Sequence, residues 1–204
     1  ITSRFEESIE VVKMLWSGEN VHFQGRYFNI DQSRINPKPV QKPRPPVFIG
    51  GTAEPAVRRA GRIGDGWIIS PDVSGSLLQK RLFHYREETR LHGINGKIAL
   101  MRPFHVTSSK AKTDEMGLLI RNHFQKKMKM GHNKGVDLPD ESKTDDASFI
   151  IGDADECINR IDYYKKNVEP EHLILLMGFK GTDLTSLTES IRLAGETVLP
   201  HFKE

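Results

Sequence analysis

Short apolar runs and amphipathic segments alternate along most of the chain. Apolar runs at residues 47–49, 67–70, 98–106 and 172–177 predict four buried strands. Segments with apolar residues at every third or fourth position predict helices at residues 3–18, 52–60, 78–89, 116–124, 153–164 and 184–198. Strands that alternate with helices in this way are typical of a parallel α/β sheet.

The residues between these elements predict their ends and connections. Ser3, with Glu6 three residues later, is expected to cap the first helix, and Asp153 is expected to cap a later one. The prolines of residues 37–46 exclude a helix and predict an extended connector to the first strand. Residues 131–148 contain hardly any large apolar side chain, and their length predicts a mobile insertion loop.

Length and composition predict a single domain over residues 1–204. The chain is 37% hydrophobic, which suffices for one substantial core but not comfortably for two. Its formal net charge of +3 is spread along the sequence, so we expect no nucleic-acid binding. We expect no membrane insertion either, because no apolar run approaches the ~20 residues needed to span a bilayer.

The one cysteine excludes an internal disulfide and is compatible with a reducing cytoplasm, where we expect the protein to be located. Cys157 follows three acidic residues at a helix start, so the pKa of its thiol should be raised. We therefore interpret Cys157 as a small core residue.

The most informative local pattern is Gly50-Gly51-Thr52-Ala53, between a predicted strand and a predicted helix. Glycines at the carboxyl end of a strand allow the backbone to turn sharply, and the first free amides of the next helix favour an anion. This turn suits a phosphate group, and the Thr52 hydroxyl is a further candidate donor. The same pattern also occurs in turns that only connect a strand to a helix.

Several spaced motifs carry a resemblance to a known family. They are RFEESIEVVKMLW at residues 4–16, FQGRYF at 23–28, PVQKPRPP at 39–46, AGRIGDGW at 60–67, GDADEC at 152–157 and VLPHF at 198–202. Together, and in this order, they resemble the bacterial luciferase-like family of flavin-dependent oxidoreductases.

The resemblance implies a (β/α)8 TIM barrel, of which this chain would contain only the C-terminal half to two-thirds. In that alignment the helix at Ser3 follows the fourth barrel strand, so the first strands are missing. The chain alone is then expected to be inactive, because half of the pocket wall is absent. The apolar pattern by itself leaves a small, self-contained doubly wound sheet equally open.

The resemblance also implies a chemistry. The expected activity is oxidation of a small organic substrate with reduced FMN and O2. A flavin reductase is the expected source of reduced FMN, and the full-length protein is expected to be a homo-oligomer. Two alternatives remain: hydride transfer with the deazaflavin cofactor F420 on the same fold, and a non-catalytic flavin-binding subunit.

The resemblance assigns cofactor phosphate binding to Gly50, Gly51, Thr52 and Ala53. Ser70, at the carboxyl end of the next strand, is a further candidate for the cofactor pocket. Arg102 is the catalytic candidate, because a fixed cation there can stabilise developing negative charge or hold an acidic substrate; an ordinary salt bridge is the alternative. Alternation places Leu100, Arg102 and Phe104 on one face of their strand. Neither metal-ligand spacing nor a nucleophile elbow is recognisable in the sequence.

Overall fold

The computed structural model describes residues 2–129 and 148–203. Its main sheet is parallel and follows the order β3–β4–β5–β6, with β7 also paired to β5. Register aligns Ile49 with Trp67 and Ile98, and Leu100 with Leu173. The strands are β3 (Phe48–Gly50), β4 (Gly66–Ile69), β5 (Lys97–Val106), β6 (Ile150–Gly152) and β7 (His172–Leu176).

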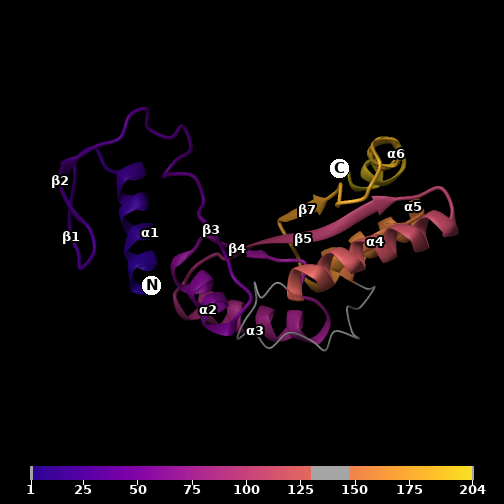
Figure 1. The fold of residues 1–204 in the computed structure, drawn as a ribbon. Coiled ribbons are helices and arrows are strands. Elements are labelled where there is room, and N and C mark those ends of the chain that lie inside the picture. Colours follow the sequence, from indigo (N-terminus) through magenta and orange to yellow (C-terminus); the bar gives the residue numbers. More distant parts are fainter. Residues whose placement is uncertain (1, 130–147, 204) are drawn as a thin grey trace.

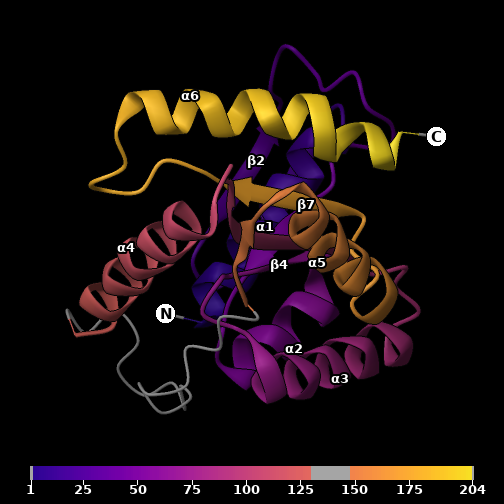
Figure 2. The ribbon, with the colours of Figure 1, turned by 90° about the vertical axis from the view of Figure 1, so that its right-hand side faces the viewer.

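One face of this sheet is covered by helices. The side chains of Ile49, Trp67, Leu100 and Phe104 point into the main core, which α2 (Glu54–Ile63), α3 (Gly75–Leu91), α5 (Ala154–Asn167) and the chain after α6 (Leu184–Leu193) complete. Figure 2 shows these helices in an arc, with α2 and α3 below the strands, α5 beside them and α6 above. Helices wrapped around one face of a curved parallel sheet indicate a barrel segment rather than a doubly wound sheet.

The opposite face of the sheet is more open. Phe48, Ile68 and Met101 on this face are only partly buried, and Ile174 is 37% exposed. The helix α4 (Lys110–Lys129) belongs to a second, smaller apolar cluster, formed by Met116, Ile120, Phe124 and Phe149.

Residues 2–33 form a unit at one end of the molecule (Figure 1). Helix α1 (Thr2–Ser17) precedes an antiparallel hairpin of β1 (Val21–Gln24) and β2 (Asn29–Ser33). The Glu7 carboxylate accepts hydrogen bonds from the amides of residues 26, 27 and 28 and so fixes the hairpin turn to the helix. Glu6 forms ion pairs with Arg59 and Arg62, which join α1 to α2.

The four predicted strands are present, with ends shifted by one residue in most cases, and the parallel α/β prediction is confirmed. The prediction of Ser3 as an N-cap is wrong, because the helix already includes Thr2 and Ser3 hydrogen-bonds Tyr27 instead. Asp153 does cap α5, in a capping box with Glu156. The predicted insertion loop at 131–148 lies outside the described residues except for Ser148.

Two further elements differ from expectation. The strand β6 was not predicted, because it has three residues and pairs only with residues 104–106 of β5. The last helix is not uniform: α6 ends at Leu193 and continues as a π-helix (Ala194–Val198) and a 3-10 turn (Leu199–Phe202).

Cys157 lies in the main core, as expected. It is fully buried, and its Sγ lies 3.7 Å from the carbonyl oxygen of Gly152. Burial, followed by the charges of Glu156 and Asp153, raises the pKa of the thiol to about 12. The thiol is therefore protonated and unreactive in the folded protein.

Candidate cofactor-binding site

The candidate site lies where the parallel strands β3 and β4 end. Gly50 is the last residue of β3 and pairs with Ile68, so residues 50–53 and Ser70 leave the sheet at the same edge. Ligands of parallel α/β proteins bind at the carboxyl edge of the strands. The structure thus brings the five residues predicted to bind the cofactor to one edge.

The two glycines of the turn differ in their surroundings. A Cβ atom on Gly50 would meet nothing within 4 Å, so this backbone is open to a ligand. A Cβ atom on Gly51 would lie 2.6 Å from the Cβ of Ala56, so only glycine fits without a local shift. The first glycine therefore leaves space, and the second lets the turn pack against α2.

The turn ends at the N-terminus of α2. Ala53 is the N-cap residue and has no side-chain cap, and the helix begins at Glu54 rather than at the predicted Thr52. Within the described residues, the amides of Thr52, Ala53 and Glu54 have no hydrogen-bond partner. Unpaired amides at a helix N-terminus form an anion-binding site.

Two side chains that the sequence analysis did not assign to the site hold this turn. Trp67 Nε1 donates to the carbonyl oxygen of Gly51 at 2.9 Å, and Arg81 Nε donates to that of Thr52 at 2.9 Å. Trp67 is also a core residue, because its side chain is fully buried. A signal for Arg81 was available: it continues the apolar stripe of Leu78, Leu82 and Tyr85 at helical spacing, where a charged residue needs a buried partner.

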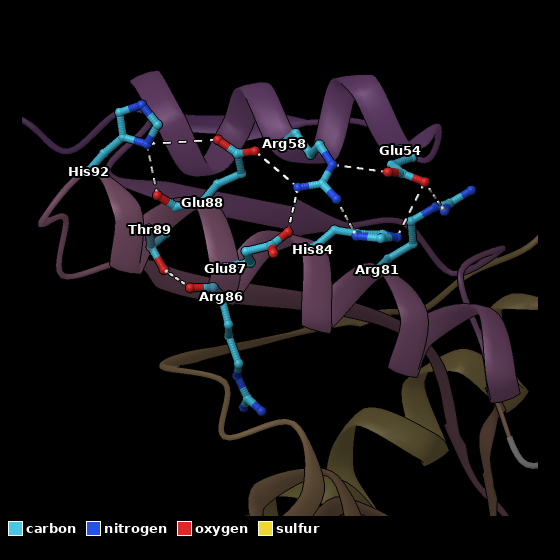
Figure 3. Close-up of polar contacts among 9 residues, drawn as sticks. All are labelled: Glu54, Arg58, Arg81, His84, Arg86, Glu87, Glu88, Thr89 and His92. Carbon is cyan, nitrogen blue, oxygen red and sulfur yellow. Dashed lines mark hydrogen bonds and ion pairs between the residues drawn. The ribbon is translucent and has the colours of Figure 1, made fainter.

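A network of charged side chains connects the start of α2 to α3 (Figure 3). Arg58 donates to Glu54, Glu87 and Glu88 at 2.9, 2.7 and 3.0 Å, and its Nη2 lies 2.8 Å from Nδ1 of His84. Hydrogen bonds to these carboxylates, that to Glu87 foremost, raise the pKa of Arg58. The hydrogen bond from Arg58 lowers the pKa of Glu54 despite some desolvation. Arg58 therefore points toward α3 and is not a direct phosphate ligand here.

Ser70 lies one residue beyond the end of β4. Its hydroxyl hydrogen-bonds the carboxylate of Asp72, and its carbonyl oxygen accepts from the amide of Val73 at 3.0 Å. The side chain is half-buried. Its contact with a cofactor stays a prediction.

Arg102 lies on the helix-covered face of β5, as do Leu100 and Phe104. The guanidinium is fully buried and donates to the Tyr164 hydroxyl at 2.8 Å, the Met101 carbonyl at 2.8 Å and the Val73 carbonyl at 3.0 Å. Desolvation lowers its pKa, although Tyr164 partly counteracts this. The catalytic role of Arg102 stays a prediction, and these contacts are those of a residue that ties β5 to α5 and to the turn after Ser70.

In the part of the chain that the structure describes, no three His, Cys, Asp or Glu side chains gather into a metal-binding group. None of the helices in residues 2–129 and 148–203 combines the length and apolar character needed to cross a membrane.

Comparison with known proteins identifies the family. The profile of the luciferase-like monooxygenases matches residues 2–168, which is most of the chain. The chain belongs to the luciferase-like monooxygenase family. Its fold is that of the luciferase-like barrel: the monooxygenase RslO1 from Streptomyces bottropensis superposes with a TM-score of 0.77 at 19% identity, over 99% of this chain and 62% of that one. The prediction of a partial (β/α)8 barrel is confirmed.

Curated members of the family that resemble this chain use two cofactors. An F420-dependent glucose-6-phosphate dehydrogenase of Nakamurella multipartita is 37% identical over 75 residues, which cover 37% of this chain and 22% of that protein. An FMNH2-dependent dimethylsulfone monooxygenase of Pseudomonas putida is 29% identical over 97 residues, covering 48% and 26%. This luciferase-like chain thus aligns with only part of these relatives. Membership of the family establishes the fold of an oxidoreductase, and both cofactors occur among its relatives.

Proposed function

We propose that this chain provides the phosphate-binding part of a flavin-dependent monooxygenase, which uses reduced FMN and O2 to oxidise a small organic substrate. The observation that carries the proposal is the turn from Gly50 to Ala53 at the N-terminus of α2 in a luciferase-like barrel, where the amides of Thr52 and Ala53 have no partner among the described residues. When bound, reduced flavin supplies two electrons to O2, so that one oxygen atom enters the substrate and the other leaves as water.

The residues present fit a terminal phosphate. The amides of Thr52, Ala53 and Glu54 supply donors, the helix dipole favours a negative charge, and Gly50 leaves the approach open. Ser70 lies at the end of the adjacent strand and is a further proposed contact of the cofactor; its hydroxyl would have to release the Asp72 carboxylate to donate to a phosphate. A flavin reductase is the proposed source of reduced FMN, because an FMNH2-dependent reaction, such as that of the dimethylsulfone monooxygenase, consumes flavin that is already reduced.

Hydride transfer with F420 is the second candidate. It is favoured by the similarity to F420-dependent dehydrogenases, two of which are 37% and 38% identical over 75 and 65 residues. The ribityl side chain of F420 also carries a phosphate, so the same turn serves both candidates. Titration of the protein with oxidised FMN and with F420, followed by flavin or deazaflavin absorbance, distinguishes them.

Replacement of Gly50 tests the phosphate assignment. Because a side chain at this position meets open space, Gly50→Leu should fold normally and cover the unpaired amides. We expect binding of FMN to weaken at least about 10-fold, and binding of riboflavin, which lacks the phosphate, to change less than about twofold. Calorimetric titration with both ligands measures the difference.

Gly195→Leu is the matched control, because its added side chain also meets open space but lies on the π-helix after α6. It should leave both affinities unchanged. If Gly50→Leu loses equal affinity for FMN and riboflavin, or loses affinity for neither, phosphate binding at this turn is contradicted.

A further inference from the structure

Two successive carbonyl groups of the turn are held by buried side chains. The Gly51 carbonyl accepts from Trp67 Nε1, and the Thr52 carbonyl accepts from Arg81 Nε, each at 2.9 Å. The donors come from different elements, β4 and α3, and both lie on the helix-covered side of the sheet.

These two hydrogen bonds determine where the neighbouring amides point. The peptide bonds after Gly51 and Thr52 are trans, and in a trans peptide group the C=O and N–H bonds point in opposite directions. The N–H of Thr52 therefore points away from Trp67, and the N–H of Ala53 points away from Arg81. Both are among the unpaired amides of the turn, and consecutive amides with one orientation form an anion-binding concavity.

Both donors are buried and packed against other side chains. Trp67 is fully buried, and its ring lies 5.5 Å from that of Tyr85. Arg81 is 9% exposed, and its Nη1 lies 3.8 Å from the carboxylate of Glu54, the first residue of α2 (Figure 3). That contact, with those of Arg58 and His84, holds the Glu54 carboxylate on the α3 side of the helix start. The negative charge nearest the turn is thus drawn toward cations and competes less with a bound anion.

We propose that Trp67 and Arg81 are positioning residues for the cofactor phosphate: each fixes one peptide plane so that the amides of Thr52 and Ala53 are presented to the anion before it binds. This inference rests on the proposed function of the turn. Preorganised donors bind an anion more tightly than mobile ones, because the ordering of the turn is already complete in the free protein.

The test uses the full chain with Trp67→Phe, Arg81→Gln and Arg81→Lys. Trp67→Phe keeps an aromatic ring in the core and removes the N–H donor. Arg81→Gln removes the charge, and Arg81→Lys retains a cation able to donate to Thr52. Affinities are measured for FMN and riboflavin, and for F420 and its phosphate-free chromophore. We expect about a 10-fold loss for the phosphate-bearing ligand in Trp67→Phe and Arg81→Gln, a smaller loss in Arg81→Lys, and less than a twofold change for the phosphate-free ligand.

Two matched controls separate positioning from general destabilisation. Tyr85→Phe removes a hydrogen bond of 2.8 Å to the Lys97 carbonyl in the same core, but none to the turn. Arg86→Gln removes an arginine of the same helix that contacts Val168 and Glu169. Both controls should keep the wild-type ratio of the two affinities, even if their melting temperatures fall.

The outcomes are distinct. If wild-type protein binds both members of a pair equally, the proposed function of the turn fails. If wild-type protein prefers the phosphate-bearing ligand and the Trp67 and Arg81 variants keep that preference, the turn binds phosphate but the positioning inference is overturned. If these variants lose affinity for both ligands equally, as a purely structural role would cause, the positioning inference is also overturned.

Discussion

Asp65 is the residue that fastens the proline-rich connector to the sheet. Its carboxylate accepts two hydrogen bonds from Arg44, at 2.6 and 3.0 Å, and one from the amide of Val47 at 2.6 Å. Partial burial raises the pKa of this carboxyl, but the hydrogen bonds from Arg44 and Val47 outweigh it and leave the pKa below its ordinary value. A charged Asp65 therefore stabilises the folded state.

The pH dependence of stability follows from that direction. Because the folded pKa is depressed, the contribution of Asp65 is complete above its unfolded pKa, about 4, and is lost as the pH falls through the folded value. Asp65→Asn should lower the free energy of unfolding by about 2 kcal/mol at pH 7 and should lessen the loss of stability on acidification. Urea unfolding at pH 7 and pH 3 measures both effects.

Asp162→Asn provides the control, since within the described residues this half-exposed carboxylate has one contact, at 3.8 Å with His201. It should resemble the wild type at both pH values. An unchanged acid sensitivity in Asp65→Asn would show that other carboxylates dominate.

Single side chains near the site show where sequence reasoning stops. The turn at Gly50 and Gly51 was predictable, because a glycine pair between a strand and a helix allows a sharp turn, whereas its binding of a phosphate stays a prediction. The apolar stripe of its helix indicated that Arg81 is buried, but the partners of Arg81 and Arg102 were not predictable. Their donors meet carbonyl oxygens at residues 52, 73 and 101, and backbone acceptors leave no mark in the sequence. The alternation of β5 correctly grouped Arg102 with Leu100, but it does not indicate which face helices cover.

The helices α2 and α3 are in close contact at Gly61. A Cβ atom there would lie 2.7 Å from the Cβ of Glu88 and 2.9 Å from the carbonyl oxygen of Tyr85. Both atoms belong to the body of α3 and cannot rotate away. Gly61→Ala should therefore force the helices apart and lower the free energy of unfolding by about 1 to 3 kcal/mol, as measured by urea denaturation.

Gly117→Ala is the corresponding control within a helix. Its nearest neighbour would be the end of Arg121 at 3.9 Å, so the higher helix propensity of alanine should stabilise the protein by up to about 1 kcal/mol. Equal effects of the two substitutions would contradict the close helix contact.

Helices and strands were predictable where burial gives their apolar residues a clear periodicity. The strands β3, β4, β5 and β7 are apolar runs, and α3 and α5 show apolar residues at helical spacing. The strand β6 has only three residues, which is too short for a period, and its existence depends on the end of β5. Although proline cannot donate a ladder hydrogen bond, β5 continues through Pro103, which pairs with Leu176.

At the scale of the whole molecule, the two apolar clusters predict unequal local stability. The larger one joins the sheet to α2, α3 and α5, whereas α4 contributes to the smaller one around Phe124 and Phe149. A segment with fewer buried apolar contacts opens at lower free energy. Amides of α4 should therefore exchange with solvent at least about 10-fold faster than those of α3, as measured by hydrogen-exchange mass spectrometry.

Met116→Ala gives a second measurement, because it removes a buried side chain from the smaller cluster alone. It should accelerate exchange in α4 and leave α3 unchanged. Uniform acceleration of both helices would show that the clusters unfold as one unit.

The architecture of the whole molecule was predictable from family resemblance rather than from periodicity. Alternating strands and helices suit both a barrel and a doubly wound sheet. The difference lies in whether helices cover one face or both, which depends on the direction of each crossover. Here residues 49, 67, 100 and 104 all point to the same helical layer. The remaining face, with Phe48, Ile68 and Met101, is the one that becomes interior in a closed barrel.

The rate at which the buried thiol of Cys157 is alkylated measures how often this part of the protein opens. With one thiol in 204 residues, an alkylating reagent has a single target, and at pH 8 that target is almost fully protonated while α5 rests on the sheet. Modification then proceeds only through molecules in which α5 has separated from β6, so the mass gained per hour reports that event. A cofactor that stabilises the contact between α5 and the sheet should slow this modification.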